Sequence, residues 1–351
     1  MKRLGAFLNN PLKVTFRLDL ARKLKFAFLR NQLSINFRLW GFYVMANTKF
    51  CQGISDISDS YTGFIIDTWG VLHDGEKVFE PAIECLQELK KRNKFVLLMS
   101  NSELNAADTA IELKKMGLPE GLYSEILTSG ELLKQGIEKQ SDGVFTGLGK
   151  SCFLIGGDRG QSFLKGAGID VVSDAEQASF VLISGWDALK SDVASYEDIL
   201  RTIVRKRLKI LCVNPDGRAM QSLSYSSGAA LISKRLQELG GVVQMIGKPY
   251  KPIYHHAIKI LHQNDIYPGQ TVMIGDSMGH DIIGATLVNM DTCLIKNGLH
   301  APIFKTADTP ASVNKILNLL ISQFNSIRPT YLVSRLKWGK ALPDRKHRKR
   351  V

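Results

Sequence analysis

The sequence lacks both long apolar runs and paired cysteines. No apolar stretch in its 351 residues approaches the roughly 18 residues of a membrane span. The cysteines are few, widely spaced and without a Cys-x-x-Cys pair, which argues against a zinc site and favours free thiols in a reducing compartment. We therefore expect a cytoplasmic protein with no membrane span. The five are Cys51, Cys85, Cys152, Cys212 and Cys293.

Acidic residues are scarce at both ends of the chain. Residues 1–44 hold nine Lys or Arg and one acid, as do residues 328–351, so each end carries +8 of the total +13 and the body carries −3. We expect nucleic acid to bind these ends only non-specifically, if at all. The first segment is interpreted as a basic extension outside the fold, with Met45 as the start, and residues 328–351 as a disordered basic tail.

Between the ends, short apolar runs alternate with helical patterns. Continuous apolar strands between helices are typical of parallel sheets covered on both faces. Eight such strands exceed one compact sheet, so we predict two α/β units, one inserted in the other. The core domain is expected over 45–127 and 241–327, and an α/β cap domain over 128–240. The predicted strands are 64–69, 95–100, 124–130, 152–157, 179–185, 209–215, 242–248 and 271–277.

Polar side chains follow several of these strands, and function gathers at the carboxyl ends of parallel strands. Asp67 and Asp276 each end an apolar run. Two carboxylates at one sheet edge repel unless a cation lies between them, and Mg²⁺ suits such oxygen ligands. Lys248 adds a positive charge, Ser100 and Asn101 offer donors to phosphate oxygens, and a carboxylate can attack phosphorus. The sequence therefore predicts a magnesium-dependent phosphoryl-transfer site.

Four segments resemble, in order, the four motifs of the haloacid dehalogenase (HAD) superfamily. They are "DTWG" (67–70), "SNS" (100–102), "GKP" (247–249) and "GDSMGHDIIGA" (275–285). The long gap between the second and third is similar to that of members with a large α/β cap inserted after motif two, such as nitrophenyl and nucleotide phosphatases. The resemblance implies a Rossmann-like core and a HAD-type hydrolase for a small phosphorylated metabolite. The resemblance is also compatible with a homo-oligomer formed through the cap.

The resemblance implies a role for each motif residue. Asp67 is the nucleophile and a Mg²⁺ ligand, the backbone carbonyl of Trp69 is a second ligand, and Asp276 is a third. Asp281 holds a metal-bound water or steadies Lys248, which balances charge. An alternative for Asp281 is an acid at the start of a helix, favoured by the helix dipole.

Trp69 departs from the family pattern, which has a second aspartate here to protonate the leaving group and deprotonate water. Indole cannot do either, and losing such catalysis typically costs about 10²–10⁴-fold. Three interpretations stay open. The first is an enzyme whose substrate has a good leaving group, or whose acid is His73 or Asp74. The second is a weak or inactive phosphate-ligand-binding protein. The third is dehalogenase-like chemistry, which would not need the magnesium carboxylates.

The cap offers two further candidates in "NPDG" (214–217). Asn214 and Asp216 follow a predicted strand and could face the substrate, but both are equally good turn formers. The sequence does not identify the substrate.

Overall fold

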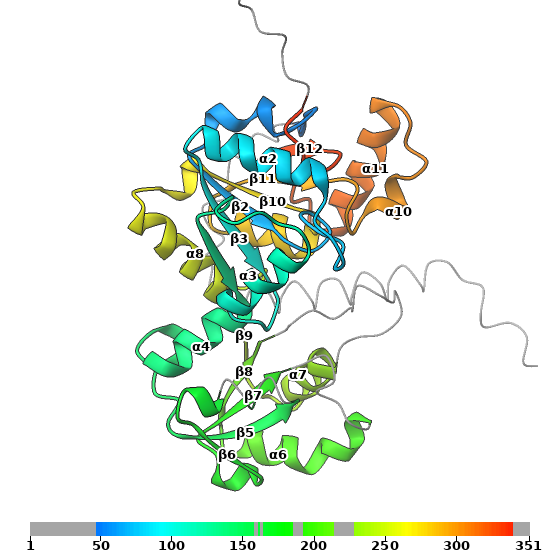
Figure 1. The fold of residues 1–351 in the computed structure, drawn as a ribbon. Helices are drawn as coiled ribbons and strands as arrows, with labels where there is room; N and C mark the ends of the chain where they lie inside the picture. Colours follow the sequence, from blue (N-terminus) through cyan, green and yellow to red (C-terminus); the bar gives the residue numbers. More distant parts are fainter. Residues whose placement is uncertain (1–46, 158–160, 162–163, 185–191, 214–227, 340–351) are drawn as a thin grey trace, which may run out of the picture. The chain divides into compact units, whose positions relative to one another are not determined.

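The protein is described by a computed structural model over residues 47–157, 161, 164–184, 192–213 and 228–339, with two separate parallel sheets (Figure 1). Over these residues no helix has the length and apolarity that crossing a bilayer demands. All five cysteines lie in this part of the chain and carry thiols, not disulfides. The two parallel sheets, with helices between their strands, confirm the predicted α/β class.

The first sheet contains seven strands, all parallel, in the order β1-β12-β11-β10-β2-β3-β4. The chain forms β1 to β4, leaves the sheet, and returns for β10 to β12. This is the insertion that the sequence predicted. The strands are β1 (Lys49–Phe50), β2 (Gly63–Asp67), β3 (Phe95–Ser100), β4 (Glu125–Thr128), β10 (Thr271–Gly275), β11 (Asp291–Ile295) and β12 (Tyr331–Val333).

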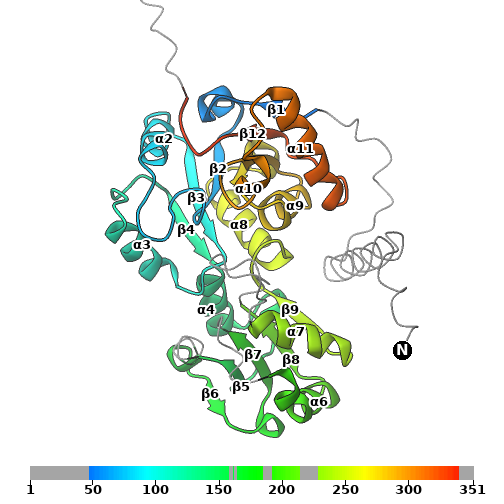
Figure 2. The ribbon, with the colours of Figure 1, turned by 90° about the vertical axis from the view of Figure 1, so that its right-hand side faces the viewer.

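Helices cover both faces of this sheet, α2 and α3 on one side and α8 and α9 on the other (Figure 2). Alternate residues of β2 point to opposite faces. Phe64 and Ile66 pack with Leu86 of α2, whereas Ile65 packs with Ala257 of α8. Burial on both faces explains the continuous apolar strand. The helices are α2 (Glu80–Lys91), α3 (Ala106–Lys115), α8 (Lys251–Gln263), α9 (Ile283–Thr286), α10 (Ala301–Phe304) and α11 (Pro310–Gln323).

The second sheet contains five parallel strands in the order β6-β5-β7-β8-β9. Its core includes residues of β7 and β8 together with α6 and α7. Helix α4 follows β4 at the point where the chain leaves the first sheet. The elements are α4 (Ser129–Lys139), β5 (Ser151–Gly156), β6 (Asp170–Val172), β7 (Phe180–Ser184), α6 (Glu197–Arg205), β8 (Lys209–Cys212), α7 (Gly228–Glu238) and β9 (Val243–Met245).

Two of the predicted domain boundaries are corrected by the strand pairing. The segment from residue 241 was assigned to the core, but β9 pairs with β8 of the second sheet. Residues from 328 were assigned to a disordered tail, but β12 lies between β1 and β11 in the first sheet. The sequence signal for β12 is weak because the strand has only three residues and lies within a basic segment. Residues 1–46 and 340–351 lie outside the described part of the chain.

The paired strand β12 predicts that the fold tolerates truncation at residue 339 but not at 327. Leu332, Val333, Leu336 and Trp338 are buried, and losing a buried Leu alone typically costs about 2–5 kcal/mol. We expect residues 45–339 to unfold at the temperature of the full chain, and residues 45–327 to be insoluble or to lack a cooperative transition. Circular dichroism melting of the two fragments measures this. Equal melting temperatures would show that β12 adds nothing.

Candidate active site

Three carboxylates meet at the carboxyl edge of the first sheet. Asp67 ends β2, and Asp276 directly follows β10, the strand paired with β2. Asp281 lies in a π-helical turn over Met278–Ile282. The three side chains are buried, and one oxygen of each lies within 4.8 Å of the others. The structure thus brings together the three acids that the sequence placed in one site, and their roles remain predictions.

Lys248 reaches this cluster from an unexpected position. The sequence placed it at the tip of a core strand, but the strand before it, β9, belongs to the second sheet. Its Nζ donates to Oδ1 of Asp67 and to Oδ1 of Asp281, each at 2.7 Å, and the residue is buried. Of the roles predicted for Asp281, the structure shows the contact with Lys248 and also the acid in the first turn of a helix, where its Oδ2 accepts from the Ser277 N–H at 3.0 Å.

The amide of Asn101 holds the backbone of Lys248 in place. Its Nδ2 donates to the Lys248 carbonyl at 3.1 Å, and its Oδ1 accepts from the Lys248 N–H at 2.6 Å. This side chain therefore positions the lysine, and its phosphate-binding role stays a prediction. Ser100, the last residue of β3, accepts a hydrogen bond from the Ser102 N–H at 3.2 Å. Its phosphate-binding role stays a prediction.

The cluster carries an excess of negative charge. With three ionised carboxylates and the ammonium of Lys248, its formal charge is −2. Burial, then the charges of Asp67 and Asp281, raise the pKa of Asp276 to about 8. Burial also raises the pKa of Asp67, to about 6, although Lys248 opposes the shift. Burial alone would lower the pKa of Lys248, but Asp281 and Asp67 hold it above its usual value. A divalent cation would neutralise the cluster.

The surroundings of Asp276 fit a hard cation held by carboxylates. The Leu299 N–H donates to its Oδ2 at 2.7 Å. Two glycines lie against the carboxylate: a Cβ added to Gly70 or to Gly298 would lie 2.2 Å from Oδ2. Gly70 also has a φ of +79°, which favours glycine. Buried carboxylate oxygens in a tight cradle suit Mg²⁺. Asp67 and Asp276 are the residues that would hold it, and the carbonyl of Trp69 remains a predicted ligand.

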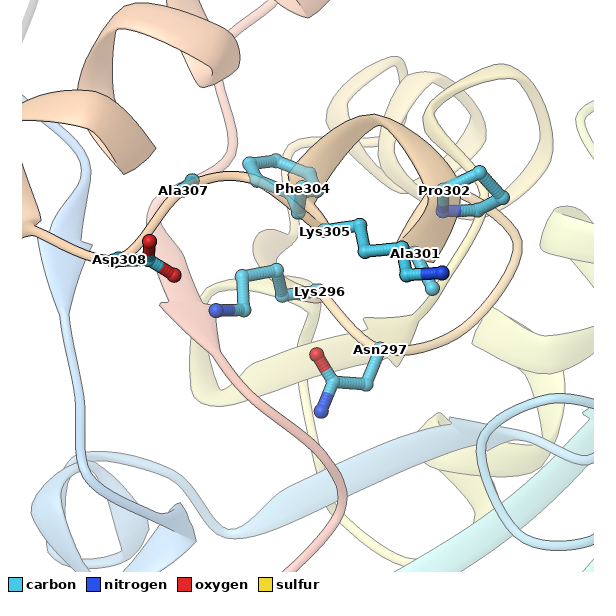
Figure 3. Close-up of a pocket in the computed structure, with 8 residues that line it drawn as sticks. All are labelled: Lys296, Asn297, Ala301, Pro302, Phe304, Lys305, Ala307 and Asp308. Atoms are coloured by element: carbon cyan, nitrogen blue, oxygen red, sulfur yellow. The ribbon is translucent and has the colours of Figure 1, made fainter.

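The segment after β11 was not recognised in the sequence as part of the site. Its Gly298 and Leu299 contact Asp276 as described above, and the Nε2 of His300 accepts from the Met278 N–H at 3.2 Å. The Asn-Gly pair after an apolar run was the available signal, since it marks a turn. The segment also borders a surface cavity of about 570 Å³, in which the side chain of Lys296 points toward Asp308 and that of Lys305 points away from it (Figure 3).

Trp69 and the turn after it form a short flap. Trp69 is half-buried and makes an isolated bridge to His73, which also bridges to Val78. His73 is buried, its Nδ1 accepts from the Gly75 N–H at 3.0 Å, and burial lowers its pKa. Asp74 accepts from two backbone N–H groups, which lower its pKa. Both candidate acids therefore take part in closing the turn, and their role as proton donors stays a prediction.

The other two candidates, Asn214 and Asp216, lie outside the described residues.

The raised pKa of Asp276 predicts that the metal-free protein loses stability as the pH rises from 7 to 8. Across this window the folded state keeps a proton that the unfolded chain, with an ordinary Asp pKa, has released, so stability falls with pH. The expected loss is about 1 kcal/mol per pH unit. Mg²⁺ binds the ionised carboxylates, so its stabilisation should grow over the same window. Melting temperatures in chelator and in millimolar Mg²⁺ measure both effects.

The matched control for this prediction is Asp276→Asn, which keeps the size of the side chain and removes its charge. In this variant the fall between pH 7 and 8 should be weaker, and Mg²⁺ should no longer raise the melting temperature. An unchanged wild-type melting curve in millimolar Mg²⁺ would contradict a cation site here.

Comparison with known proteins identifies the family. Residues 64–170 match the haloacid dehalogenase-like hydrolases, and residues 245–337 match HAD-hydrolase-like proteins. Chronophin of Mus musculus is 24% identical over 269 residues, covering 73% of this chain and 88% of that protein. The 5'-nucleotidase YutF of Bacillus subtilis is 24% identical over 242 residues, covering 68% and 89%.

The crystal structure of a haloacid dehalogenase-like hydrolase from Brucella suis superposes with a TM-score of 0.63 at 25% identity. The match covers 82% of this chain and 99% of that one. It agrees with the two parallel sheets and with the insertion of the second between β4 and β10. The chain belongs to the haloacid dehalogenase-like hydrolases, in the branch that carries an α/β cap domain inserted after the second motif.

Proposed function

We propose that the protein is a magnesium-dependent phosphohydrolase that acts on a small phosphorylated metabolite through an aspartyl-phosphate on Asp67. The observation that carries the proposal is the cluster of three buried carboxylates, two of which accept hydrogen bonds from the ammonium of Lys248. The relative from Bacillus subtilis is named a 5'-nucleotidase, which is an activity on phosphate monoesters. Substrate class and mechanism are thus supported by the site and by kinship together.

The hydrogen bonds of Asp67 indicate which oxygen reacts. Both the Thr68 N–H, at 2.8 Å, and Nζ of Lys248, at 2.7 Å, donate to Oδ1. These donors fix the carboxylate and favour its ionised form, which is the nucleophile. Oδ2 is then the oxygen that attacks phosphorus. When bound, Mg²⁺ supplies charge stabilisation for the phosphoryl oxygens.

The reaction then proceeds in two steps. Attack by Asp67 forms a bond to phosphorus as the bond to the leaving oxygen breaks, and the leaving group takes the electron pair. Water next attacks the phosphoryl group, which releases phosphate and restores the carboxylate. Because Trp69 cannot give a proton in the first step or accept one in the second, we propose slow turnover and a requirement for a good leaving group.

The alternative is a phosphate-ligand-binding protein that turns over little or not at all. It is favoured by one observation, that the residue in the acid/base position is Trp69 while His73 and Asp74 are occupied in the flap. Binding needs the cation, Lys248 and the phosphate donors, but no proton transfer. The two functions therefore share a site and differ in chemistry.

Phosphate release and acid-trapped aspartyl-phosphate, measured on a panel of phosphorylated metabolites with and without Mg²⁺, test the proposal. We expect Mg²⁺-dependent labelling that vanishes in Asp67→Asn. Tight binding of a phosphate ester by the wild type, with no labelling of Asp67 from any substrate, would favour the binding protein. Equal release from wild type and Asp67→Asn would contradict the assigned nucleophile.

A further inference from the structure

Trp69 follows the proposed nucleophile closely in the chain. It lies two residues beyond Asp67, just past the tip of β2, and it is half-buried, so part of it is open to solvent. Its backbone is fixed by the bridge to His73, and the Gly70 N–H donates to the His73 carbonyl at 2.8 Å. The residue is therefore held close to the attacking carboxylate.

The polar edge of the indole faces the flap. A Cβ added to Gly75 would lie 3.4 Å from Nε1 of Trp69, so the N–H edge rests over this glycine. Gly75 has a φ of +98°, a conformation that side chains rarely adopt, and its N–H donates to His73. With the nitrogen next to the turn, the carbon atoms and the π face of the indole are what the ring can offer to a substrate.

This arrangement lacks a proton donor but offers an aromatic surface. A phenol such as the side chain of Tyr has a pKa of about 10, whereas that of water, which an aliphatic alcohol resembles, is about 16. An aryloxide therefore leaves phosphorus without being protonated, and an alkoxide does not. Planar aromatic groups also stack on indole. The missing acid and the open ring thus favour the same leaving group.

We propose that Trp69 determines specificity for aryl phosphates, with the aromatic leaving group stacked on the indole; the proposal rests on the function proposed above. Asp67 forms its bond to phosphorus as the bond to the aryl oxygen breaks, and the aryloxide departs with the electron pair and takes a proton from solvent. The substrate class is then a phosphate monoester of a phenol or of another hydroxylated aromatic ring.

The test compares phenyl phosphate with acetyl phosphate, whose leaving group is also good but not aromatic. In Trp69→Leu we expect kcat/KM for phenyl phosphate to fall about tenfold, the size of one aromatic stacking pair, and that for acetyl phosphate to change less than twofold. Trp69→Phe keeps a ring, so both substrates should stay within threefold of wild type. An equal fall for both substrates in Trp69→Leu would overturn the proposal.

A binding measurement keeps the proposal testable if Trp69→Leu fails to fold. In Asp67→Asn, phenyl phosphate should quench tryptophan fluorescence, and the quench should be lost when Trp69→Phe is added. A quench that persists there would overturn stacking on this ring. Failure of the proposed function gives a different result, because neither phenyl nor acetyl phosphate would then label Asp67 in the wild type.

Discussion

Mixing the wild-type protein with a saturating aryl phosphate in Mg²⁺ should release a burst of about one phenol per active site. Steady turnover should then be about 10²–10⁴-fold slower than the burst. The first step needs no proton because the aryloxide leaves as a stable anion. The second step needs a base for water, and the indole of Trp69 has none to offer. Aspartyl-phosphate should therefore accumulate. Rapid quenching in acid, with counting of both released alcohol and labelled protein, measures it.

Two variants test the origin of the burst. Asp67→Asn should show neither burst nor label because the nucleophile is gone. Trp69→Asp should show fast, linear release with little trapped label, since the new carboxylate can deprotonate water. Linear release by the wild type at saturating substrate, with no labelled protein, would show that another residue acts as the base.

The strand-tip residues were predictable because parallel strands present their carboxyl ends at one edge. An apolar run that ends in Asp67, and another that ends before Asp276, suffice to place two carboxylates together. The parallel pairing of β2 with β10 then brings them within reach. For these residues the local pattern and the topology carry the same information.

Lys248 shows where such reasoning fails. Its position after an apolar run predicted a core strand, but Val243–Met245 pairs with the second sheet. An apolar run marks a buried strand without stating which sheet it joins, because that depends on pairing between distant segments. The hydrogen bonds between Asn101 and the backbone of Lys248 are equally long-range. No local pattern could reveal them.

Short or partly polar strands were missed for a different reason. Strand β11, Asp291–Ile295, begins with Asp, Thr and Cys, so only two of its residues are strongly apolar. The Gly298 and Leu299 contacts to Asp276 follow from this strand and were missed with it. Strand β12 was hidden by the basic character of its segment. In both cases the sheet, through its neighbouring strands, determines a structure that the local sequence signals only weakly.

The largest gain of activity should come from Trp69→Asp, and it should depend on the leaving group. For an alkyl phosphate ester we expect kcat/KM to rise about 10²–10⁴-fold, because the new carboxyl can protonate the departing alkoxide. For an aryl phosphate kcat/KM should instead fall about tenfold, because formation of the aspartyl-phosphate needs no acid and the variant lacks the ring on which the leaving group stacks. Its kcat should rise, because hydrolysis of that intermediate becomes faster.

Trp69→Asn is the matched control for this prediction. It has nearly the size and shape of Trp69→Asp, and it leaves the same space over Gly75, but it cannot exchange a proton. If the gain is due to proton transfer, only Trp69→Asp should show it, while both variants melt at the same temperature. Steady-state kinetics on one alkyl and one aryl ester, with melting curves of both variants, decide the outcome. Equal activities of the two variants on the alkyl ester would show that this position does not reach the leaving group. Fast turnover of the alkyl ester by the wild type would show that another residue supplies the acid. Trp69 would then not select substrates by whether their leaving group needs a proton.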